Sequence, residues 1–204
     1  KYKVIKDKPN EVLIHKWFYE NGIQKKLETK KADSNKNFGE SKEWYDNGQL
    51  KEQSNFIDNT TRTGKWLKFW EDGSKKLEAD FKDGKVYFEN YWNEEGEQTL
   101  INGTGLYVKE WNSFKSTTIY ETEYKNYLRD GKSRTIRKGV VSLEQEFKEG
   151  EEHGITKSYY DNGNLEQETV YENGTAISTK KFPKFKNPKI KTSVISRICD
   201  GCYK

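Results

Sequence analysis

The stretch Trp44-Tyr45-Asp46-Asn47-Gly48-Gln49-Leu50 decides the fold, because two adjacent aromatic residues precede Asn-Gly and an apolar residue soon follows it. Asn-Gly readily adopts positive φ at both central positions of a type I′ turn, the tight connection between twisted antiparallel strands. Aromatic residues favour strands. The stretch therefore predicts a β-hairpin with a two-residue loop, Asn47 and Gly48, at its tip.

The same signal recurs along the chain at nearly constant spacing. Nine of the sixteen Gly follow Asn or Asp, Asp130-Gly131 among them, and we expect these pairs to be hairpin tips. The principal turns are 26, 25, 23, 43 and 24 residues apart, and the longest gap predicts a hidden turn near Asn112 and Ser113. About seven units of about 24 residues then fill the chain as far as residue 177. The principal turns lie at Gly22, Gly48, Gly73, Gly96, Gly139 and Gly163.

A two-residue loop fixes which residues face each other across each hairpin. Around Gly163 it sets Tyr160 opposite Leu165 and Lys157 opposite Glu168. It also places a Gly opposite an aromatic ring in several units, and a ring over a bare backbone stabilises a strand that lacks a side chain there. The predicted pairs of this kind are Gly39–Phe56, Gly64–Phe81 and Gly154–Tyr171.

Alternate residues of a strand point to opposite faces of a sheet, so this register assigns every ring to a face. Tyr45, Trp70 and Tyr160 share one face with the rings that lie eight residues after each turn, and we expect that face to be the core. The opposite face mixes rings with charged residues, which is typical of a surface that meets water or a partner. Packing alone also explains rings repeated at one register. The candidate partner-binding residues are Phe18, Trp44, Phe69, Tyr159, Lys42 and Lys157.

These motifs resemble MORN-type repeats, and most closely the bacterial MORN variant of the YwqK-type antitoxin family. The resemblance covers about residues 10–177, is clearest in 40–96 and 139–177, and is degenerate in 97–131. It implies an all-β fold, an elongated single-layer antiparallel sheet of repeated β-hairpins. It also implies a scaffold for protein contacts, in some cases one that associates with membranes.

The composition suits such a thin sheet. Hydrophobic residues make up only 31% of the 204 residues and charged residues 34%, but 14% are aromatic, and disordered chains usually lack aromatic residues. Hairpins that pack mainly on their neighbours need little core. We expect an N-terminal cap or edge in 1–10, a repeat domain in 11–177 and a basic tail in 178–204. The tail residues 179–204 carry eight basic residues and one acid, a net charge of +7.

No pattern in the sequence predicts catalysis. His15 and His153 lie in unrelated contexts, and no Ser, Cys or carboxylate recurs beside either of them as a nucleophile would. Carboxylate pairs fall in predicted turns or links, and no Gly-rich phosphate loop occurs. We therefore expect a protein that is not an enzyme and that has no cofactor and no metal site.

The tail offers two further candidate sites. Its Lys residues could attract phosphate groups of an anionic membrane surface, or they could belong to a solvated linker or to an edge strand protected against aggregation. Cys199 and Cys202 predict a local disulfide or two free thiols. A metal site is a weaker alternative because no second Cys pair exists, and a redox pair is weaker because the sequence predicts no thioredoxin-like unit. The candidate anion-binding residues are Lys180, Lys181, Lys184, Lys186, Lys189 and Lys191.

Two functions fit these observations. The first is a non-enzymatic scaffold that binds another protein, as an antitoxin or immunity-type factor would. The second is a cell-envelope module that binds a glycan or anionic lipid. We expect no specific nucleic-acid partner and no transmembrane segment, because no run approaches about 20 apolar residues. The chain begins at Lys1 and has no Met, so we expect that a leading segment has been removed, which leaves a cytoplasmic and a secreted location open.

Overall fold

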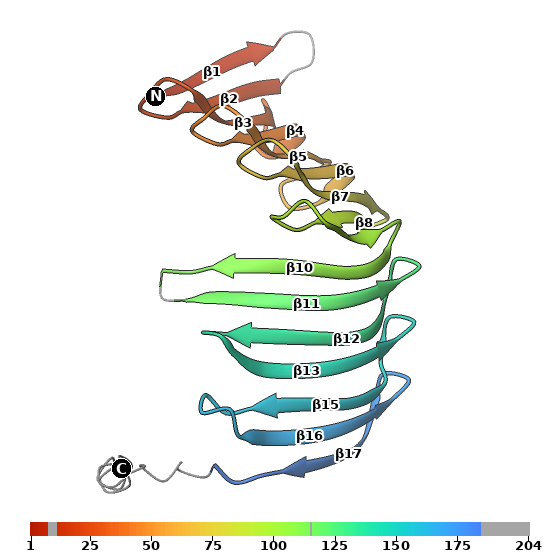
Figure 1. Cartoon of the computed structure of the whole chain (residues 1–204). Helices are drawn as coiled ribbons and strands as arrows, with labels where there is room; N and C mark the ends of the chain where they lie inside the picture. Colours follow the sequence, from red (N-terminus) through yellow and green to blue (C-terminus); the bar gives the residue numbers. More distant parts are fainter. Residues whose placement is uncertain (8–11, 115, 185–204) are drawn as a thin grey trace, which may run out of the picture.

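The computed structural model describes residues 1–7, 12–114 and 116–184, which form one open antiparallel sheet (Figure 1). Each strand pairs with its neighbours in the sequence, and β14 and β15 follow each other along β13. No helix occurs among the described residues, so the predicted all-β sheet of consecutive hairpins is confirmed. The strands are β1 (Tyr2–Asp7), β2 (Val12–Phe18), β3 (Gln24–Lys31), β4 (Asn37–Trp44), β5 (Leu50–Phe56), β6 (Arg62–Phe69), β7 (Lys75–Lys82), β8 (Lys85–Trp92), β9 (Gln98–Ile101), β10 (Thr104–Asn112), β11 (Thr117–Lys125), β12 (Leu128–Arg137), β13 (Val140–Lys148), β14 (Glu151–Glu152), β15 (Gly154–Tyr159), β16 (Leu165–Glu172) and β17 (Thr175–Lys181).

The principal turns are longer than the sequence predicts. Tyr45 N–H donates to the Gln49 carbonyl at 2.9 Å and Gly48 N–H to the Tyr45 carbonyl at 3.1 Å, so three residues form the loop. Gly48 has φ +90°, whereas Asn47 keeps a negative φ. This is a type I turn followed by a left-handed residue, the usual form of a three-residue hairpin loop. The prediction of a two-residue type I′ loop is wrong at the turns of Gly22, Gly48, Gly73, Gly96 and Gly163.

A bulge next to each of these loops restores the predicted register in the body of the hairpin. Leu165 pairs with Tyr159, so the prediction that it pairs with Tyr160 is wrong. The register then shifts by one residue between Ser158 and Tyr159, and beyond the shift Lys157 pairs with Glu168 as predicted. One extra residue in the loop and one bulged residue in the strand therefore compensate each other.

The predicted pairing of Gly with rings is confirmed and extends further than expected. Gly39–Phe56, Gly64–Phe81 and Gly154–Tyr171 are all opposed, and Gly131 opposes Phe147 in the same way. Gly131 lies inside β12, so the prediction that Asp130-Gly131 is a hairpin tip is wrong. The hidden turn is where it was expected, because Ser113 N–H donates to the Ser116 carbonyl at 3.0 Å between β10 and β11.

Side-chain hydrogen bonds to the main chain tie several units to the next one along the sheet. In four units the second ring of the aromatic pair donates to a main-chain carbonyl about 24 residues further along the chain, and that carbonyl belongs to the first ring position of the next unit. Tyr45, Trp70 and Tyr160 were expected in the core, but they are only half-buried and serve as ties between units. The ties are Tyr19 to Trp44 at 2.7 Å, Tyr45 to Phe69 at 3.0 Å, Trp70 to Trp92 at 3.2 Å and Tyr160 to Phe182 at 2.9 Å.

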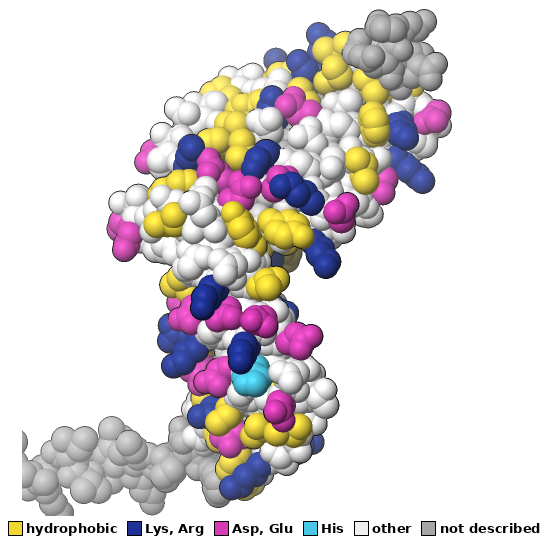
Figure 2. Space-filling model, turned by 90° about the vertical axis from the view of Figure 1, so that its right-hand side faces the viewer, with side chains coloured by type: hydrophobic (Ala, Val, Ile, Leu, Met, Phe, Trp, Pro, Cys, Tyr) yellow, Lys and Arg dark blue, Asp and Glu magenta, His cyan; other side chains and the backbone are white. Residues whose placement is uncertain are grey.

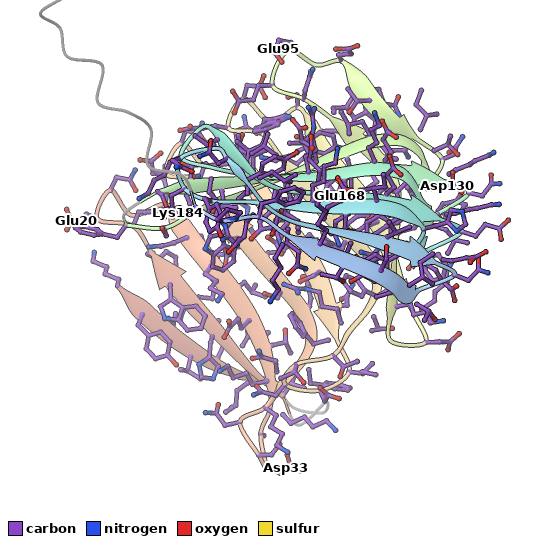
Figure 3. The ribbon with its side chains drawn as sticks, turned by 90° about the horizontal axis from the view of Figure 1, so that it is seen from below. Glu20, Asp33, Glu95, Asp130, Glu168 and Lys184 are labelled. Atoms are coloured by element: carbon purple, nitrogen blue, oxygen red, sulfur yellow. The ribbon has the colours of Figure 1, made fainter. Side chains whose placement is uncertain are left out.

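The best-buried apolar cluster lies at the middle of the sheet, where β7 to β10 meet. Leu77, Tyr91, Leu100 and Tyr107 form it, and Leu77 and Leu100 are almost fully buried. Strand β9 has only four residues and pairs briefly with β8 and β10. The N-terminal half, β1 to β8, and the C-terminal half, β10 to β17, run at a wide angle to each other across this junction (Figures 1 and 3).

Candidate functional site

The observed register gives the sheet two distinct faces along its whole length. One face carries the apolar cluster and is called the cluster face. The other, called the polar face, carries two continuous rows of paired residues. The row of the N-terminal half is Leu27, Lys42, Gln53, Leu67, Glu78 and Asn90, and the row of the C-terminal half is Val108, Glu121, Arg134, Glu144, Lys157, Glu168 and Lys180.

The C-terminal row alternates in charge on six consecutive positions, from Glu121 to Lys180, and is called the charge row. Arg134 Nη2 lies 2.7 Å from Glu121 Oε2, and the Arg134 side chain is 50% exposed. Opposite charges directly across neighbouring strands stabilise a sheet. Glu168 lies midway along the strands of this half in the view of Figure 3.

A shallow hollow of about 400 Å³ opens over the charge row. Its lining includes the row residues Glu121, Arg134, Glu144 and Lys157, and Ile155 adds an exposed apolar side chain. The hollow is wide and mostly charged. This composition suits a polar peptide surface better than an enclosed small molecule, because small-molecule pockets are mostly apolar.

The candidate ring residues fall into two separate groups. Phe18, Trp44 and Phe69 end strands β2, β4 and β6, so they lie in one column at the turn edge of the N-terminal half. Tyr159 ends β15 in the other half, and β7 to β13 lie between the two groups. All four rings are half-buried. Trp92 continues the column, which the sequence analysis did not predict because its unit is irregular.

The two candidate Lys residues lie on the polar face near these rings. Lys42 precedes Trp44 by two residues on the same face and makes an ion pair with Glu40 at 2.7 Å. Lys157 precedes Tyr159 in the same way and lies between Glu144 and Glu168 in the charge row. The structure therefore brings Lys42 together with the first ring group and Lys157 together with the second.

Tyr159 connects its ring group to the charge row. Its hydroxyl donates to Glu144 Oε2 at 2.5 Å. Burial, together with this hydrogen bond to a carboxylate, raises the pKa of Tyr159 to about 12. The hydroxyl therefore stays protonated at neutral pH and acts as a hydrogen-bond donor.

A second set of contacts at the turn edge was missed by the sequence analysis. A Lys ammonium lies over each second ring of the aromatic pairs, and at Trp70 the Lys76 nitrogen is only 3.4 Å from the ring centre. Burial lowers the pKa of Lys76. A Lys six residues after the ring in three units was the signal that could have predicted these contacts. The pairs are Lys25–Tyr19, Lys51–Tyr45, Lys76–Trp70 and Lys184–Tyr160.

The candidate tail sites are only partly described. Lys180 and Lys181 lie in β17, and Lys184 lies over the Tyr160 ring at the end of the described chain (Figure 3). The other candidate residues, Lys186, Lys189, Lys191, Cys199 and Cys202, lie outside the described residues.

Charged side chains of both signs are interleaved with apolar ones along the side of the molecule in Figure 2. Within residues 1–7, 12–114 and 116–184, no three His, Cys, Asp or Glu side chains converge as metal ligands would. The described part of the chain also holds no helix that is long and apolar enough to cross a membrane.

Comparison with known proteins agrees with the repeat. Residues 39–58, 62–83 and 152–173 match the sequence profile of the family described as MORN repeat variant. A search of curated proteins finds no match. Repeats of this family generally act as non-catalytic binding modules. The three matches fall on the hairpins β4–β5, β6–β7 and β15–β16, and together with the consecutive hairpins of the sheet they support a MORN-type repeat in this chain.

Proposed function

We propose that the chain is a non-catalytic scaffold that binds another protein through the polar face of its sheet. The observation that carries the proposal is the charge row, in which six positions alternate in sign and the first four line a hollow of about 400 Å³. Fixed, alternating charges favour a partner of complementary pattern and disfavour others. An antitoxin or immunity-type role, which the resemblance implies, is the narrower form of this proposal.

A charge reversal with a matched control tests the polar face. The partner is captured from an extract of the source cell with the intact chain, identified, and then titrated as a purified protein. Lys157→Glu places three acids in sequence in the row and is expected to weaken binding by about tenfold or more. Lys109→Glu makes the same charge change on the cluster face and should leave the affinity unchanged. Equal affinity of both variants and the intact chain would refute the polar face as the binding surface.

The ring residues are tested by their effect on stability as well as on binding. Replacing Trp44, Phe69 and Tyr159 with Ser should weaken partner binding, while the melting temperature changes little if these rings mainly face the partner. A large fall in melting temperature would instead assign them to packing, which their half-buried positions also allow.

A cell-envelope module is the second candidate function, and it rests on the concentration of positive charge after residue 178. Lys180, Lys181 and Lys184 are exposed or lie at the edge of the sheet. Vesicles containing anionic lipid should then bind the chain at low salt and release it at high salt. Replacing the six candidate Lys residues between positions 180 and 191 with Ser should abolish this binding; unchanged binding would exclude the proposal.

A further inference from the structure

Strand β17 begins an eighth unit of the repeat, of which the structure describes only this first strand. Its continuation places Phe182 where Trp44 and Phe69 lie in complete units, because the Phe182 carbonyl accepts the hydroxyl of Tyr160 at 2.9 Å. Phe182 N–H also continues the ladder by donating to the Glu166 carbonyl at 2.8 Å. The repeat therefore extends, in correct register, to the position where the next loop would begin.

Pro183 stands where a complete unit has its second ring. In those units the N–H of the second ring residue closes the three-residue loop, as Tyr160 N–H does by donating to the Asn164 carbonyl at 2.9 Å. Pro has no N–H, so this bond cannot form after β17. Among the described residues, the outer edge of β17 pairs with no strand.

The direction of the free main-chain groups follows from the register. Phe182 N–H points toward β16, and N–H groups of successive residues in an antiparallel strand alternate in direction. The N–H groups of Thr179 and Lys181 therefore point away from β16, toward the open edge. All seven residues of β17 are exposed, so a further strand can reach these groups.

The charges at this edge define the partner. Lys180 is the last member of the charge row, and its inner neighbour in the row is Glu168. An acidic residue opposite Lys180 on an added strand would continue the alternation of charge along the row. Lys181 and Lys184 add positive charge beside it. The other end of the sheet is a poor match, because the sequence of β1 carries two Lys and one Asp and would bring like charges together.

We propose that the outer edge of β17 binds an acidic, extended segment of another protein, which adds to the sheet as one more antiparallel strand. Main-chain groups of Thr179 and Lys181 supply the hydrogen bonds, and an acidic side chain of the segment lies opposite Lys180. This mode of recognition takes affinity from the main chain and selectivity from side chains. The site lies at an edge of the sheet and shares Lys180 with the charge row, but its main-chain hydrogen bonds do not involve the hollow on the polar face.

The chain's own second strand provides the probe. A synthetic peptide with the sequence of residues 164–173, Asn-Leu-Glu-Gln-Glu-Thr-Val-Tyr-Glu-Asn, carries three acids and no base and presents a Glu to Lys180 in the register of β15 with β16. We expect it to bind the full chain, to shift the amide resonances of Thr179 and Lys181, and to slow their hydrogen exchange. The same peptide with its three Glu replaced by Lys should not bind.

Two variants at one position separate the main-chain contribution from the charge. Lys181→Pro removes an outward N–H and breaks no bond to β16, so peptide affinity should fall by about tenfold or more. Lys181→Gln removes the same charge, keeps the N–H and should lose less affinity. Circular dichroism spectra and melting curves of both variants, compared with those of the parent chain, serve as the control for folding.

Several results would overturn the proposal. Binding of both peptides with equal affinity would show that charge does not select the strand, and absence of binding would show that the edge does not accept one. If Lys181→Pro bound the peptide with full affinity, the main-chain N–H of residue 181 would not contribute to binding. If the intact chain associated with itself and Lys181→Pro did not, the edge would bind a second copy of the chain instead. The Lys157→Glu variant should bind the peptide normally, which distinguishes failure here from failure of the polar-face proposal.

Discussion

At the scale of single residues, the Tyr hydroxyl groups that tie neighbouring units should contribute measurably to the free energy of unfolding. Tyr45→Phe removes the hydrogen bond to the Phe69 carbonyl and leaves the ring in place. We expect the free energy of unfolding to fall by about 1 kcal/mol, because a carbonyl loses its partner at a half-buried site. Urea unfolding measures this change. Tyr120→Phe is the matched control, since that ring is 37% exposed, and an equal loss in the control would contradict the role of the tie.

The buried Tyr hydroxyls predict a loss of stability at high pH. Burial raises the pKa values of Tyr91 and Tyr159 to about 12, above the usual value of 10. A raised folded-state pKa means that the stabilisation is complete below pH 10 and is lost as pH rises toward 12. Melting temperature should therefore fall across this window, and ultraviolet titration should detect late-ionising Tyr. Tyr159→Phe should remove one late-ionising group, and an unchanged titration curve would contradict the assignment.

Residue identity predicts where the hairpins turn but not the length of each loop. Asn-Gly occurs at the three-residue loop of Gly48, where Asn47 keeps a negative φ, and also at Asn173-Gly174, where both residues have positive φ. The dipeptide is compatible with both loop types, so contacts with the neighbouring unit decide between them. Asn47 shows such a contact, because its side-chain amide donates to the Glu71 carbonyl of the next turn at 2.8 Å. The sequence of one unit does not contain this information.

At the scale of elements, the short strand β9 is the most sensitive point of the sheet. Leu100 is fully buried in the cluster between the two halves, whereas the next residue, Ile101, is 53% exposed. Leu100→Ala should lower the free energy of unfolding by about 2 to 5 kcal/mol, and Ile101→Ala by much less. Thermal or urea unfolding of both variants tests the difference. Equal effects would mean that the junction is not the core of the molecule.

The junction at β9 could not be predicted from the repeat. Regular units were predicted with the correct pairing of Lys157 with Glu168, because their period is nearly constant. The junction breaks the period, and it depends on Gly105, where an added Cβ would lie 2.2 Å from the Thr99 carbonyl oxygen. The candidate site likewise has one part that the sequence predicts and one part that it does not. The residue types on the polar face follow from alternation, but the continuous charge row depends on the pairing of β13 with β15 around β14, which has no regular sequence signal.

At the scale of the whole molecule, a repeat of this kind gains stability mainly between nearest neighbours. The cluster face concentrates apolar burial at the junction, and this leaves the polar face free for a row of charges on the C-terminal half. Among the described residues, both end strands, β1 and β17, have an outer edge that pairs with no strand. The two edges differ in charge, because β1 carries two Lys and one Asp, whereas β17 ends in Lys180 and Lys181 and carries no acid. The two proposals therefore use different parts of the sheet, the polar face and the β17 edge.

The elongated sheet predicts the dimensions of the molecule in solution. The 17 strands occupy 16 positions, since β14 and β15 share one, and a spacing of about 4.8 Å gives a length of about 72 Å along the sheet. A compact globule of 204 residues would have a radius of gyration of about 17 Å. We expect small-angle X-ray scattering to give a radius of gyration above about 20 Å, because mass spread along a rod lies further from its centre. A chain ending at Lys184 should be measured beside the full chain, so that the last twenty residues do not account for the difference. A value near 17 Å for the shorter chain would mean that the two halves fold back on each other in solution, and the polar face could not then present its two rows along one extended surface.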